Sequence, residues 1–235
     1  MKIIIAPSKT MKYSGIDIVG SKPLYPKETE YLHNLLKQYN DEQLCEFMKI
    51  SYKQATQVYR YFHEPQTEHP ALFFYQGTVF KQLDLSSYHL HQTYLENHLR
   101  ILDAYYGVLL YNTSITPYRL DMTMKPQNMN LYEYWYTPLY QHFEQEDYII
   151  SLASKEFTNM LRHPHIYFID FIIIDQGKIK RNAVIIKKAR GQMLNQMILQ
   201  EIETLDELKT LNIDGFTYNP QYDQEGTLAF VKERT

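Results

Sequence analysis

The chain has 235 residues, of which 44% are hydrophobic and 22% are charged, so it can bury a sizeable core. The net charge of −3 argues against a protein that is basic over its whole surface, and the single cysteine excludes an internal disulfide framework and a cysteine-based metal site. One cysteine also fits a reducing cytoplasm. We expect a cytoplasmic protein without a membrane segment, because no apolar run approaches the roughly 20 residues that a membrane span needs.

The first element is a predicted buried strand, Lys2–Ala6. Lys9 lies in the turn that follows it, at the carboxyl end of the strand. Ligands bind at such ends in open α/β sheets. Lys9 is therefore a candidate anion-binding residue, and an ordinary surface lysine is the alternative.

After a loop over residues 14–25, apolar spacing and capping residues predict helices, followed by a second buried strand and a further helix that Gly107 ends. The predicted ranges are the helices Lys27–Tyr39, Glu42–Lys49 (capped by Asp41), Tyr52–Phe62 (capped by Ser51) and Leu90–Tyr106, and the strand Ala71–Tyr75.

Pro117–Met122 is predicted to be extended, so Arg119 and Asp121 share one face. Two interpretations stay open for Arg119. It can pair with Asp121, or it can be held free for an anion.

A third buried strand, Tyr148–Leu152, leads to Ser154, a candidate cap for a helix that starts at Lys155. A strand that runs into a capped helix is a natural place for an anion, although the cap alone would explain Ser154. The remaining predictions are a hairpin of His165–Ile174 with Lys178–Lys188, helices Ala189–Glu203 and Leu205–Leu211, and a closing strand pair of Phe216–Tyr218 with Leu228–Val231.

Hairpins and strand–helix units thus coexist, with no internal repeat and no low-complexity linker. The sequence predicts one compact α/β (α+β) domain over residues 1–235, in which helices surround a mixed sheet.

Basic residues concentrate in one segment. Residues 176–200 contain six lysines or arginines and no acidic residue, which leaves 18 basic and 27 acidic residues elsewhere. Lys187, Lys188 and Arg190 follow a β-branched run, Asn182–Ile186, and precede a helical pattern. Cations at a strand-to-helix junction oppose the helix dipole by about 0.3–1 kcal/mol each unless an anion occupies the junction. The alternative is that all three side chains extend into solvent.

Metal and nucleotide motifs are weak or missing. His89, His91 and His98 invite a zinc site, but no carboxylate falls at a usable helical spacing, so we predict no metal. The chain has neither a Gly-x-Gly-x-x-Gly motif nor a Walker-type loop, and we predict no cofactor.

Several blocks resemble the bacterial peroxide-stress protein YaaA family and keep its order along nearly the whole chain. Pro117–Leu120 and Lys187–Gly191 are the most specific. The other blocks are Ala6–Thr10, Ile50–Lys53, Phe62–His63, His98–Arg100, Tyr106–Leu109, Leu131–Trp135 and Leu152–Ser154. Within them, the residues that can support an anion site are Ser8, His98, Arg100, Gly107, Ser154 and Gly191.

The resemblance implies a cytoplasmic protein that limits damage from free iron during peroxide stress. It further implies the compact arrangement called the cantaloupe fold, a positive cleft, and a helix-hairpin-helix element that binds DNA. That element would correspond to the region around Tyr106 and Gly107.

Two functions follow. The first is a monomeric stress protein that binds DNA, duplex or with unpaired regions, through Lys9, Arg119, Lys187, Lys188 and Arg190. The second is an enzyme that uses the same cations to hold a small phosphorylated or nucleobase-containing substrate. The second function requires these side chains to gather in one concave pocket, whereas DNA contacts would spread along an open groove.

Overall fold

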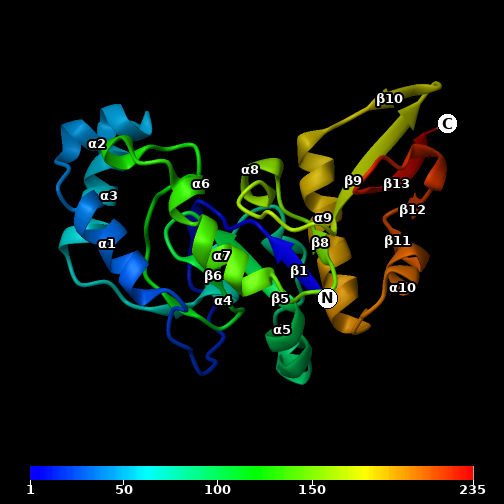
Figure 1. Cartoon of the computed structure of the whole chain (residues 1–235), viewed down its shortest axis with the longest axis horizontal. Helices are drawn as coiled ribbons and strands as arrows, with labels where there is room; N and C mark the ends of the chain where they lie inside the picture. Colours follow the sequence, from blue (N-terminus) through cyan, green and yellow to red (C-terminus); the bar gives the residue numbers. More distant parts are fainter. Residues whose placement is uncertain (235) are drawn as a thin grey trace.

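A nine-stranded mixed sheet runs through the computed structural model, which describes residues 1–234 (Figure 1). Helices surround this sheet in a single compact domain, so the predicted α/β class is confirmed. In spatial order the strands are β11 (Asn212–Ile213), β12 (Phe216–Tyr218), β13 (Thr227–Arg234), β9 (Ile166–Asp175), β8 (Ile149–Ser151), β1 (Lys2–Ile5), β5 (Leu99–Asp103) and β6 (Gly107–Leu109), with β10 (Lys178–Lys180) on β9.

The sheet is parallel at its centre and antiparallel at its ends. β1 pairs in parallel with β5 on one side and β8 on the other, and β8, β9 and β13 continue the parallel run. β6, β10 and β12 pair antiparallel with β5, β9 and β13, and β11 pairs antiparallel with β12. The predicted closing pair of β12 with β13 is therefore confirmed.

Strand β1 explains why the centre is parallel and deeply buried. Ile3, Ile4 and Ile5 are at most 1% exposed, as expected for a continuous apolar strand covered on both faces. Burying each such side chain stabilises the fold by about 1.5–3 kcal/mol. Because β1, β5 and β8 run in the same direction, their carboxyl ends meet at one edge of the sheet.

Helices cover this sheet and extend beyond its β6 end, where α1, α2 and α3 gather (Figure 1). The helices are α1 (Pro26–Leu36), α2 (Asp41–Met48), α3 (Tyr52–His63), α4 (Ala71–Phe74), α5 (Gln92–His98), α6 (Leu131–Tyr134), α7 (Tyr136–Phe143), α8 (Lys155–Thr158), α9 (Ala183–Leu199) and α10 (Leu205–Thr210). Short two-residue strands and 3₁₀ turns complete the fold: β2 (Thr10–Met11), β3 (His69–Pro70), β4 (Tyr75–Gln76), β7 (Ser114–Ile115), η1 (Phe80–Gln82), η2 (Tyr88–Leu90), η3 (Pro126–Asn128) and η4 (Pro220–Tyr222).

The three predicted N-terminal helices are present, and Ser51 caps α3 through the backbone N–H of Gln54 as expected. The cap of α2 is Asn40 rather than Asp41, because the Asn40 side chain accepts the N–H of Gln43 and the Gln43 side chain accepts that of Asn40.

The predicted strand Ala71–Tyr75 is wrong, since Ala71–Phe74 forms α4. All four residues of α4 are buried. A short apolar run that is buried on every side carries no periodicity, so the sequence alone cannot distinguish strand from helix there.

The predicted helix Leu90–Tyr106 is also wrong beyond His98. Leu99–Asp103 forms β5, and all five of its residues are buried beside β1 and β6. Gly107 starts β6 with φ +76°, and an added Cβ would approach the Trp135 ring to 2.5 Å. The region around Tyr106 and Gly107 is a β-hairpin, so the expected helix-hairpin-helix is absent from this place.

The predicted strand Asn182–Ile186 and the strand-to-helix junction are wrong as well. β10 ends at Lys180, and α9 begins at Ala183 with Asn182 as its cap. The Asn182 side chain accepts the N–H groups of Val184 and Ile185, and this cap outweighs the strand preference of the β-branched run. Lys187, Lys188 and Arg190 consequently lie inside the helix.

Candidate functional site

A pocket of about 540 Å³ opens at the carboxyl ends of β1 and β8. We call it the strand-end pocket. Six of the residues predicted for an anion site line it: Ser8, Lys9, Arg119, Ser154, Lys187 and Arg190. They come from four separate segments of the chain, so the fold brings together what the sequence keeps apart.

Two neighbouring parallel strands position one side of the strand-end pocket. β1 ends at Ile5 and leads to Ser8 and Lys9, and β8 ends at Ser151 and leads to Ser154. Ser154 occupies the N-cap position of α8, but its side chain makes no capping hydrogen bond. The expected cap bond is thus absent, and the Ser154 side chain lies at the pocket instead.

Helix α9 supplies the opposite side. Lys187 and Arg190 are three residues apart and so share one face of the helix. Next to them, Gly191 lets α9 approach the turn before η1 closely, because an added Cβ would lie 2.3 Å from the Val79 carbonyl oxygen. Val79 also lines the pocket. Gly191 therefore acts through packing and holds α9 against the pocket wall.

Each of the two arginines of the pocket has a buried N–H donor that makes no hydrogen bond to a described residue. The Nε atoms of Arg119 and Arg190 are both buried, and neither has a hydrogen-bond acceptor among the described residues. The Arg190 guanidinium lies 5.2 Å from the centre of the Phe168 ring, and burial lowers its pKa. A buried unpaired donor costs about 1–3 kcal/mol, so each arginine carries an unmet hydrogen bond.

The pocket also has an acidic side, which the sequence analysis missed. Lys9 Nζ lies 2.6 Å from an oxygen of Asp121, so Asp121 pairs with Lys9 and not with Arg119. Glu156 lines the same pocket, and its carboxylate accepts the backbone N–H of Met122 at 3.2 Å. Burial, reinforced by the charge of Asp121, raises the pKa of Glu156. Its place two residues after Ser154 was the signal that could have identified it.

Asp103, at the end of β5, organises a buried polar cluster that reaches the pocket through Tyr118. Its carboxylate accepts hydrogen bonds from the hydroxyls of Tyr75 (3.0 Å) and Tyr118 and from the backbone N–H groups of Tyr105 (2.7 Å) and Tyr106 (2.9 Å). Burial raises the pKa of Asp103 while these donors oppose the rise. Tyr118 lines the pocket and directly precedes Arg119, so this cluster fixes the segment that carries the arginine.

The other predicted residues lie elsewhere. Lys188 is exposed on α9 and is not among the residues that line the strand-end pocket. Arg100 is 8% exposed, and its guanidinium donates to the carbonyls of Glu96 and Leu99 and to the His142 ring. Gly107 packs against Trp135. Arg100 and Gly107 therefore support the fold.

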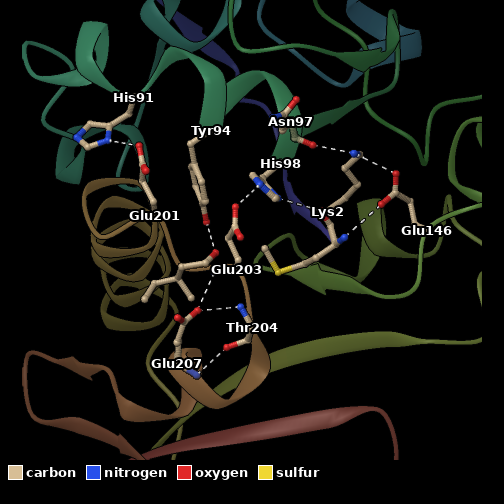
Figure 2. A network of polar contacts seen from close by, with 12 residues as sticks. Lys2, His91, Tyr94, Asn97, His98, Glu146, Glu201, Glu203, Thr204 and Glu207 are labelled. Atoms are coloured by element: carbon tan, nitrogen blue, oxygen red, sulfur yellow. Dashed lines mark hydrogen bonds and ion pairs between the residues drawn. The ribbon is translucent and has the colours of Figure 1, made fainter.

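His98 belongs to a polar network near the amino end of β1 (Figure 2). Its ring contacts the Met1 carbonyl oxygen at 3.2 Å and lies 3.4 Å from a carboxylate oxygen of Glu203. In the same network, the Met1 amino group and Lys2 both pair with Glu146. These contacts connect α5 and β1 to the segments after α7 and α9, so the role of His98 is also structural.

Across the described residues, no group of three His, Cys, Asp or Glu side chains is placed to hold a metal ion. Among the same residues, no helix combines the length and apolarity needed to cross a membrane.

Comparison of the sequence with known proteins identifies its family. The chain is 34% identical to a UPF0246 protein of Finegoldia magna, over 99% of this chain and 98% of the relative. It is 32% identical to one of Pediococcus pentosaceus (99% and 98%) and 30% identical to one of Crocosphaera subtropica (99% and 100%). The sequence profile described as "Peroxide stress protein YaaA" matches residues 1–222. The chain therefore belongs to the YaaA family of peroxide stress proteins.

Proposed function

We propose that this chain serves the peroxide-stress response, in the cytoplasm, by binding a small phosphorylated molecule in the strand-end pocket. One observation carries the proposal: Arg119 and Arg190 both line the pocket, and each has a buried Nε without an acceptor in the described part of the chain. A phosphate group supplies several acceptor oxygens at once and suits the planar fork of a guanidinium.

The shape of the pocket favours a small ligand over a polymer. Its volume of about 540 Å³ lies within the range of small-molecule sites, about 300–1,000 Å³. The cations converge on it from the turn after β1, from α9 and from the segment after β7, and it lies at the strand ends where α/β proteins bind ligands. Such a pocket suits an enzyme that acts on the bound molecule.

Isothermal titration calorimetry with inorganic phosphate and pyrophosphate tests the proposal. We expect pyrophosphate to bind, and Arg119→Gln or Arg190→Gln to weaken binding by about tenfold, the loss of roughly 1.4 kcal/mol of a charge-assisted bond. Lys178→Gln is the matched control, because Lys178 is exposed on β10 and does not line the pocket. Absence of binding by folded wild-type protein would contradict the proposal.

DNA is the second candidate ligand, and a different observation favours it. Lys187 and Lys188 are both exposed on α9, and Lys187 also lines the pocket, so a basic surface continues outward from it. Two other basic residues of the 176–200 segment contribute less to this surface, since Lys180 pairs with Asp175 and Arg181 with Asp170.

Fluorescence anisotropy with duplex, bubble and single-stranded DNA across a salt series tests this candidate. If DNA binds here, Lys187→Ala/Lys188→Ala should weaken binding and reduce the log–log salt slope on duplex by about 1.8, or roughly 0.9 per phosphate contact. A salt-independent signal, or an unchanged slope in the double variant, would argue against it.

Protection against free iron, which the family resemblance implies, we propose to be indirect. The motivating observation is the lack of a three-ligand His, Cys, Asp or Glu group among residues 1–234. Anaerobic titration with ferrous iron should give no saturable heat. A stoichiometric binding isotherm would overturn the indirect role.

A further inference from the structure

Two opposite charges of the strand-end pocket, those of Arg119 and Glu156, do not pair with each other. Arg119 lines the pocket without an ion pair among the described residues, and its Nε is buried. Glu156 lines the same pocket, and among the described residues its carboxylate accepts a hydrogen bond only from the Met122 backbone N–H. If Glu156 served only to neutralise surplus cations, we would expect it to pair with an arginine of the pocket.

The two carboxylates of the pocket differ in their partners, because Asp121 pairs with Lys9. Asp121 has its cation at 2.6 Å, whereas Glu156 makes no ion pair with a described residue, and the charge of Lys9, which lowers its pKa, acts on it only from farther away. A half-buried carboxylate without a cation partner is costly, since desolvation disfavours its charged form. The raised pKa of Glu156 agrees with this arrangement.

Resting on the proposed phosphate site, we infer that the ligand is zwitterionic: its phosphate binds Arg119 and Arg190, and an amino group at its other end binds Glu156. One such ligand would supply both missing partners together. The class is a small phosphate monoester that carries a primary amine.

The segment after β7 links the two ends of this site. Arg119 and Asp121 lie on it, and Met122 of the same segment fixes the carboxylate of Glu156. The positions of the phosphate-binding and amine-binding groups are therefore coupled through one short stretch of backbone. That stretch is in turn anchored by the Tyr118 hydroxyl on Asp103.

The test compares matched ligands that differ in the amino group alone. Glucosamine 6-phosphate and glucose 6-phosphate form one pair, and O-phosphoethanolamine and ethyl phosphate form a shorter pair. Calorimetry at pH 7 with wild-type protein should show at least fivefold tighter binding of the amino member of one pair or both. In Glu156→Gln the preference should fall to about one, because the amide can still accept the Met122 N–H but carries no charge.

Three controls separate this inference from the proposed function. Arg119→Gln should weaken the amino and non-amino ligands alike and so leave the preference in place. Lys178→Gln, remote from the pocket, should change neither affinity, and thermal melts should show that every variant is folded.

Equal affinities within both pairs, or a preference that survives Glu156→Gln, would overturn the zwitterion inference while leaving the phosphate site intact. Failure of all four ligands, together with phosphate and pyrophosphate, would overturn the phosphate site itself.

Discussion

The hydroxyl of Tyr118 donates a hydrogen bond to the carboxylate of Asp103, and this bond joins a residue that lines the strand-end pocket to the end of β5. Asp103 is fully buried and accepts from four donors, two hydroxyls and two backbone N–H groups. An aspartate can satisfy four donors because, when ionised, it is an acceptor only. The position is therefore specific for a carboxylate.

Asp103→Asn should destabilise the protein by about 1–3 kcal/mol, because the amide presents two donors to groups that are themselves donors. Urea unfolding followed by the fluorescence of Trp135, the single tryptophan, measures the change. Trp135 is fully buried and its indole N–H donates to Ala104, next to Asp103, so it reports on this region.

Tyr118→Phe is the graded control for this prediction. It removes one donor from the Asp103 cluster and should cost about 1 kcal/mol. A destabilisation by Asp103→Asn no larger than that of Tyr118→Phe would contradict the four-donor account.

Gly191→Ala should destabilise the protein by about 1–3 kcal/mol through overpacking, since its Cβ would lie 2.3 Å from the Val79 carbonyl oxygen. Helix propensity alone favours alanine over glycine by roughly 1 kcal/mol, so the two effects predict opposite signs. The measurement is the midpoint of urea unfolding, with Lys188→Ala on the exposed face of α9 as control. Stabilisation by Gly191→Ala would show that α9 is free to move away from the turn before η1.

The contribution of the sequence to the fold is clearest where a residue pattern decides the structure locally. The β1 run has no polar residue after Lys2, and Ser51 with Gln54 forms a complete capping box, so both elements are where the pattern predicts them. The errors fall where long-range packing overrides local preference. Leu99–Asp103 is a strand because β1 and β6 pair with it, and the sequence of that segment alone does not identify these two strands as its partners.

In the candidate site, too, the residues placed by local patterns could be predicted and those placed by long-range packing could not. Lys9 and Ser154 could be predicted because strand ends are recognisable in sequence and neighbouring parallel strands place their ends together. Lys187 and Arg190 line the pocket because they lie on one face of α9. The sequence instead predicts them at a strand-to-helix junction. The place of Glu156 two residues after Ser154 was a usable signal, but its contact with the distant Met122 backbone could not be predicted from the sequence.

A half-buried histidine provides a prediction about pH. His142 accepts a hydrogen bond from Arg100 Nε through its Nε2 at 3.2 Å. Burial, with the charges of Arg100 and Lys2, lowers its pKa from 6.5 to about 4, and only Glu146 opposes the change. The folded state therefore keeps His142 neutral at pH values where the unfolded chain already binds a proton.

The stability that depends on neutral His142 should be complete above pH 6.5 and decline as the pH falls toward 4, since the unfolded state then binds more protons than the folded one. Thermal melts from pH 7.5 to 4.5 measure this decline. His142→Gln should make it shallower, because glutamine offers Arg100 an acceptor that does not titrate in this range. His165→Gln, at an exposed histidine, should leave the wild-type profile unchanged. Parallel profiles for wild type and His142→Gln would show that His142 does not control acid stability.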